Sequence, residues 1–229
     1  MIAYELGVYS AGADTLTVYP VTAAAGDQLV ALITWAISGV VSPVPPAGWT
    51  ELDRKSTATH HWAVFAHDVS EALTGASLVW TAATTVAAGV VVVYRGGQVG
   101  LVEFIDAMAV VDVAAGTQHA FPTLAVGTTQ GSDRLLIVQW LLSAGAVTAA
   151  DPALSYDGVE LLASYPLLEG TIVAFEGSPR TIGEQGDGPT TQSSPACNST
   201  SGMVALRSRA LVRGAAVMDA QPGHIGLLP

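Results

Sequence analysis

Histidine and aspartate side chains gather in one short segment, where they could in principle bind a metal ion. The segment contains His60, His61, His67 and Asp68, and imidazole and carboxylate groups are ordinary zinc ligands. However, residues 60–68 alternate as a β-strand does, so His61 and His67 would lie about 20 Å apart at ~3.3 Å per residue. They cannot share one ion. We therefore predict no metal site and interpret these side chains as polar strand ends beside a loop.

Carboxylates are available for a second kind of chemistry, the hydrolysis of a glycosidic bond, which needs two of them facing each other across a cleft. Nothing in their spacing selects a pair. We interpret them as solvated loop acids, and a glycan hydrolase is the least favoured function. The candidates are Glu103, Asp106, Asp157, Glu160 and Glu176.

Two further segments contain residue types that are used in catalysis or binding. The sequence GEQGDG at 183–188 is rich in glycine, but Glu184 and Asp187 would repel a phosphate and no lysine follows. Cys197 is the single cysteine, which excludes an internal disulfide framework. Without a paired histidine we predict that it is packed or inert, and without a leader the sequon at 198–200 is idle. We predict no catalytic residue and no cofactor.

The five tryptophans could stack on sugars, which makes a carbohydrate-binding module for host-surface glycans the second hypothesis. Strand tryptophans are more often core anchors. We predict that Trp35, Trp49 and Trp140 are structural anchors, with Trp49 an apolar plug at the end of a proline-fixed loop at 43–48. Trp62 is the candidate for an exposed, sugar-stacking ring.

The elements that carry these residues are predicted to be strands. Of 229 residues half are hydrophobic but only 12% are charged, against roughly 25% in an ordinary soluble domain. No long stretch has the 3.6-residue period of a helix. Apolar or alternating runs predict strands at 15–20, 29–35, 60–68, 77–81 and 89–95, whereas 51–59 is interpreted as a polar turn and 178–200 as a long surface loop.

The second half of the chain repeats the first in a degraded form. Residues 119–140 have the outline of residues 15–35, so that Gly26 matches Gly131 and Trp35 matches Trp140. We predict an all-β fold, in which pseudo-repeats at about 15–98 and 119–209 form a single antiparallel β-sandwich over residues 1–209. The shared core is predicted to contain Leu32, Trp35, Phe65, Val92, Ile137, Trp140 and Phe175.

Charge and apolar patterning limit the possible partners. A formal net charge of −11 argues against nucleic acid. No apolar run reaches the ~20 residues of a membrane helix, and no signal peptide is recognised. The runs Val90–Val93 and Leu135–Val138 are apolar on both faces, so either the chain's own loops or a neighbour must cover their outer side. The economical arrangement for a neighbour is a symmetric homo-oligomer such as a trimer.

The segment 210–229 is predicted to be a C-terminal extension past the closing strand. Its apolar side chains would be costly to expose. We predict that it docks on a neighbouring subunit or across its own sheet and fastens the protein into an assembly. The possible contact residues are Leu211, Val217, Met218, Ile225, Leu227 and Leu228.

These residues together carry a family resemblance. Gly26-Asp27, a buried strand, Pro45-Pro46-Ala47-Gly48-Trp49-Thr50 and a closing Val-Val-Val-x-Tyr-Arg-Gly resemble the β-sandwich domain of tailed-bacteriophage virion proteins over residues 15–209. The resemblance implies a jelly-roll-like fold in a non-enzymatic minor tail or capsid-decoration protein. It also implies other virion proteins as partners, and a place in a virion that is assembled in the host cytoplasm. The family supplies no catalytic residues.

Overall fold

A computed structural model describes residues 15–37, 42–81, 87–94, 102–122, 124, 134–142, 148–150, 159–167, 170–177 and 190–208. These residues form strands and their connections, and every strand pairing is antiparallel. The predicted all-β sandwich is therefore confirmed. The strands are β1 (Thr15–Ala23), β2 (Gln28–Ala36), β3 (Thr50–Ser56), β4 (His60–Asp68), β5 (Leu73–Thr81), β6 (Ala87–Tyr94), β7 (Val102–Ala120), β8 (Arg134–Leu142), β9 (Thr148–Ala150), β10 (Val159–Leu167), β11 (Gly170–Gly177) and β12 (Thr190–Ser208).

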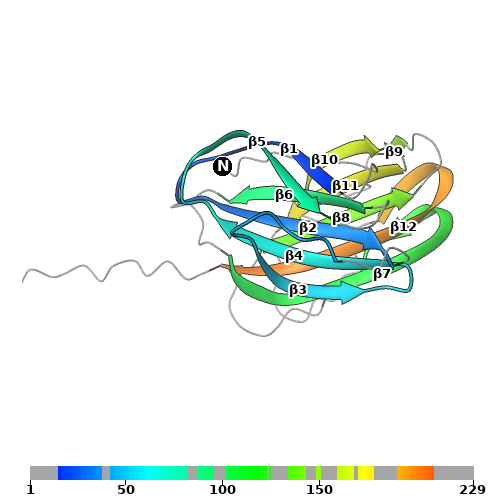
Figure 1. Ribbon diagram of the computed structural model, residues 1–229. Helices are drawn as coiled ribbons and strands as arrows, with labels where there is room; N and C mark the ends of the chain where they lie inside the picture. The colour runs from blue at the N-terminus through cyan, green and yellow to red at the C-terminus, as the bar shows by residue number, and fades with distance from the viewer. Residues whose placement is uncertain are drawn as a thin grey trace, which may run out of the picture.

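The strands form three sheets that lie as layers. The first half of the chain supplies a two-stranded ribbon, β1-β5, and a middle sheet in the order β3-β4-β2-β6. The second half supplies a large sheet in the order β10-β11-β8-β12-β7, with β9 paired to β12. In Figure 1 the ribbon lies above the middle sheet, and the long strands β7 and β12 run side by side and bend together at one end.

The core between the middle and large sheets draws side chains from both halves of the chain. It includes Leu32 and Val92 from the middle sheet and Trp140 and Val204 from the large sheet, all 1% exposed or less. Alternation of side chains along each strand sends these residues to one face. One sandwich core is thereby built from two halves.

A second core fills the space between the middle sheet and the ribbon. Trp35, Phe65 and Val91 from the middle sheet pack there against Leu16 and Trp80 from the ribbon. The two-faced apolar run at 90–93 is therefore covered by the chain's own β1-β5 ribbon. The outer face of β8 is also buried by this chain, in a third cluster that includes Ile137 and Phe121.

These clusters correct two predictions. The expected single shared core is divided among three clusters, because residues of opposite parity on one strand face opposite layers; Phe175 has a side chain outside the described residues. The two-faced runs also give no reason to require a neighbouring subunit, since the chain buries both faces itself.

The middle sheet and the large sheet share one strand order. β2 and β8 hold equivalent places, as do β4 and β11, and β6 and β12. Trp35 and Trp140 nevertheless lie on opposite faces, since Trp35 packs under the ribbon and Trp140 between the sheets. The two matched tryptophans therefore belong to different cores, and a shift of one residue along a strand is enough to exchange its faces. The large sheet also includes β7, which starts at Val102 and pairs with β12.

Two segments that were expected to be irregular contain strands. Residues 51–59 include β3, whose exposed and half-exposed charged side chains suit the edge of the middle sheet. Residues 190–200 belong to β12, although they are rich in serine and threonine. Ser201 shows why a polar residue is tolerated in the buried part of β12, because its hydroxyl accepts a hydrogen bond from Gln139 Nε2 at 2.8 Å. Residues 178–189 lie outside the described part.

Candidate functional site

Four of the five tryptophans are buried in the cores. Trp35, Trp62, Trp80 and Trp140 are each 1% exposed or less. Trp35 and Trp140 thus anchor the cores, one under the ribbon and the other between the sheets. The Trp35 ring also lies 5.1 Å from the Arg54 guanidinium carbon of β3, and a hydrogen bond with Glu51 raises the pKa of Arg54.

Trp49, which the sequence predicted to be an apolar plug, is half-buried and packs against the core beneath the ribbon. Its ring stacks on His67 with centroids 5.5 Å apart and meets Trp80 edge-on at 5.1 Å. The imidazole is fixed in turn, because its Nδ1 lies 2.9 Å from the Gly48 carbonyl oxygen and donates to it. The proline loop therefore ends in an aromatic stack at the margin of the ribbon core.

Trp62 does not offer a ring to a sugar, which corrects the sequence-based hypothesis. Its side chain is fully buried and its indole Nε1 donates to Thr200 Oγ1 at 3.0 Å. On β12 Gly202 leaves room for the ring: a Cβ atom at that position would lie 2.7 Å from Trp62 Cε3. This close approach joins the middle sheet to the large sheet.

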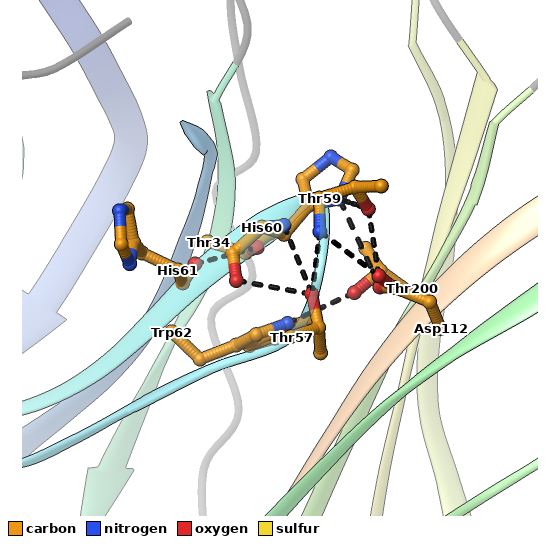
Figure 2. Close-up of polar contacts among 8 residues, drawn as sticks. All are labelled: Thr34, Thr57, Thr59, His60, His61, Trp62, Asp112 and Thr200. Atoms are coloured by element: carbon orange, nitrogen blue, oxygen red, sulfur yellow. Dashed lines mark hydrogen bonds and ion pairs between the residues drawn. The ribbon is translucent and has the colours of Figure 1, made fainter. Parts of the chain in front are cut away.

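Beside this indole lies a group of polar residues that we name the inter-sheet cluster, shown in Figure 2. The turn between β3 and β4 provides its first part, since the His60 amide donates to Thr57 Oγ1 at 2.9 Å. Asp112 on β7 provides its second part and accepts from the Thr59 amide at 3.1 Å and the Thr59 hydroxyl at 2.8 Å. The cluster consists of Thr57, Thr59, His60, Trp62, Asp112 and Thr200.

Burial and hydrogen bonding determine the charge states of the cluster. Burial alone would raise the pKa of Asp112, but hydrogen bonds from Thr59, Thr57 and Thr200 outweigh it and lower that pKa. Burial lowers the pKa of His60 by more than the nearby Asp112 charge raises it. His60 Nδ1 lies 3.9 Å from Asp112 Oδ1, and the imidazole meets the Trp140 ring at 5.6 Å between centroids. A neutral imidazole thus lies beside an ionised carboxylate.

The residue types in the cluster resemble a hydroxyl, histidine and carboxylate relay, but their geometry does not. A nucleophilic hydroxyl must donate its proton to an imidazole base. The single hydroxyl proton of Thr59 instead goes to Asp112, and the hydroxyl oxygen lies 2.7 Å from His60 Nδ1 and accepts from it. The cluster is arranged to bridge two sheets.

The other residues considered as metal ligands each have a different hydrogen-bond partner. His61 Nδ1 lies 2.7 Å from the Ser56 hydroxyl, His67 contacts Gly48, and Asp68 accepts from Gln28 Nε2 at 2.8 Å. Among the residues that the structure describes, no three histidine, cysteine or carboxylate side chains gather as a metal site.

Cys197 has a histidine neighbour that sequence spacing did not reveal. Its buried sulfur lies 3.7 Å from Nε2 of His119, an imidazole on β7 with no exposed surface. Burial lowers the pKa of His119. The two residues are 78 positions apart and meet because β7 pairs with β12. The expectation that no histidine accompanies Cys197 is therefore wrong, while the prediction that it is packed is confirmed.

For the carboxylates considered for glycan hydrolysis, the structure describes at most the position of the backbone. Glu103 and Asp106 are on β7, and Glu160 lies opposite Glu176 in the β10–β11 register. Their side chains lie outside the described residues. Several other residues named in the sequence analysis lie wholly outside the described part of the chain. These are Gly131, Asp157, the glycine-rich segment at 183–188 and the possible assembly contacts in 210–229.

No protein-family model, curated protein or solved structure matches the chain. In the described ranges no helix is long and apolar enough to span a membrane.

Proposed function

We propose that this chain is a non-enzymatic structural protein of a tailed-phage virion, either a minor tail protein or a capsid-decoration protein. It acts by packing against copies of itself and other virion proteins. The proposal begins from the sequence resemblance over residues 15–209 and from the low content of charged residues.

The use of polar groups inside the sandwich is the structural observation that supports this proposal best. Thr59, Asp112 and Thr200 direct their polar atoms at one another or at Trp62, and so hold the two sheets together. A scaffold needs this kind of internal bridging, whereas a catalyst needs polar groups aimed at a substrate. The low charge and the apolar segment 210–229 favour self-association. The two-faced strands do not require it, since the chain covers them itself.

The alternative is a carbohydrate-binding module, and the half-buried stack of Trp49 and His67 is the observation that favours it. Aromatic faces at a loop margin are suited to sugar stacking. Four buried tryptophans leave Trp49 as the indole through which such a module would act.

Light scattering of the purified full chain and a glycan-array assay separate the two functions. The structural proposal predicts a homo-oligomer whose mass grows with concentration and no retention of any glycan. A monomer that binds glycans, and loses that binding in Trp49→Ala, would contradict it and favour the module.

A further inference from the structure

The imidazole of His60 lies where the middle sheet meets the large sheet. Its side chain is 7% exposed and lies between the β3–β4 turn and the large sheet. Its Nδ1 is 2.7 Å from the Thr59 hydroxyl, which in turn donates to Asp112. Thr59 therefore links this imidazole to Asp112 on β7 through two hydrogen bonds.

A second proton on His60 would be difficult to accommodate. The imidazole lies against the Trp140 ring, an apolar neighbour from β8. The nearest carboxylate oxygen, Asp112 Oδ1, is 3.9 Å from Nδ1, which is beyond hydrogen-bonding distance. Nδ1 already donates to the Thr59 hydroxyl, so the added proton would be on Nε2, and the resulting charge would have no direct hydrogen bond to a carboxylate. A buried charge of this kind is costly, so the imidazolium gains by moving out toward water.

The surroundings of His60 contain few other charges. Asp112 on β7 is the described carboxylate that faces it, and His61 is the neighbouring titratable group on its own strand. From β8 and β12 come Trp140 and Thr200, neither of which titrates near neutral pH. Proton uptake at His60 is thus opposed by burial and favoured mainly by one carboxylate.

We propose that the inter-sheet cluster is an acid-sensitive latch: protonation of His60 withdraws it from Trp140 and loosens the attachment of the β3–β4 turn to β7. At neutral pH the latch is closed. As the pH falls below the ordinary histidine range, opening becomes coupled to the uptake of one proton. The inference is independent of the virion assignment, because it concerns contacts within this chain alone.

Hydrogen exchange at the Thr59 amide reports directly on the latch, since that amide donates to both Asp112 Oδ2 and Thr57 Oγ1. The experiment uses the full chain at several pH values from 7.5 to 5.0, with rates corrected for the intrinsic pH dependence of exchange. Protection should fall with acidification, by at most about tenfold per pH unit for one linked proton. His60→Gln should remove this pH dependence, and His67→Gln, on the same strand, should retain it.

His119 is a second buried imidazole, so the local readout at Thr59 matters more than global stability. Equal protection at pH 7.5 and 5.0 in the wild-type chain would overturn the proposal, as would a loss that persists in His60→Gln. If that variant does not fold, the NMR titration of His60 in the wild-type chain decides. A pKa below 6.5 that coincides with the loss of Thr59 protection supports the latch, whereas a pKa above 6.5 refutes it.

Discussion

The indole nitrogen of Trp62 donates a hydrogen bond to the hydroxyl of Thr200 over 3.0 Å, although the two residues are 138 positions apart in the sequence. Trp62 belongs to β4 of the middle sheet and Thr200 to β12 of the large sheet. This bond crosses the core of the sandwich and connects the first half of the chain to the second. It also explains why a threonine is stable in a buried strand position.

Replacing each partner of this bond should be costly by itself. Thr200→Val leaves the buried indole N–H without an acceptor, which should destabilise the fold by about 1–3 kcal/mol. Trp62→Phe removes the donor and some apolar volume. In a double-mutant cycle measured by denaturant unfolding, the pair should show a coupling energy of about 0.5–3 kcal/mol. Strict additivity would mean that the bond does not form in solution.

Gly202→Ala should destabilise the sandwich by about 1–3 kcal/mol, because the added methyl group would overlap the Trp62 ring. Gly116→Ala is a matched control in the paired strand β7. Its Cβ would meet no neighbouring atom closer than 3.7 Å. Thermal unfolding should therefore separate the two variants, and equal melting temperatures would show that Trp62 does not pack on Gly202.

Trp49→Ala should cost less than removal of a fully buried ring. Because Trp49 is half-buried against His67 and Trp80, we expect about 1–3 kcal/mol. The control Trp80→Ala, at a position with no exposed surface, should cost about 3–5 kcal/mol. The order of the two unfolding midpoints checks this, and a larger loss for Trp49 would contradict the half-buried placement.

Asp112 should make stability fall in acid. Its pKa in the folded chain is below the ordinary value of 3.8, so its contribution is complete above that value and is lost as the pH falls toward the folded pKa. Asp112→Asn should therefore be less stable than the wild-type chain at pH 7. The difference in unfolding free energy should shrink below about pH 4, and a constant difference would show that the carboxylate is not held as an ion.

The sequence was sufficient to predict the fold class and most strands of the first half, because apolar runs such as 29–35 have strand length and clear turn residues at their ends. The outer ribbon was harder to foresee. Nothing in the pattern of β1 or β5 says that they pair with each other and cover Val91 from outside. That arrangement depends on which layers stack, and a strand pattern does not encode it.

The candidate site was largely hidden from the sequence for a related reason. Thr59 and Asp112 are 53 positions apart, and Cys197 and His119 are 78 apart. Such contacts arise from the pairing of β7 with β12 and from the stacking of two sheets. The histidines at 60 and 61 were recognisable as polar residues on a strand, but their opposite orientations give them different partners.

An electron-microscopy density map of tailed-phage particles assembled in the presence of this chain tests the central proposal most directly. The account predicts copies of the β-sandwich at symmetry-related positions on the capsid or tail, each packed against a neighbouring subunit. A particle map without density for the sandwich, combined with a soluble monomer that turns over or binds a glycan, would contradict it.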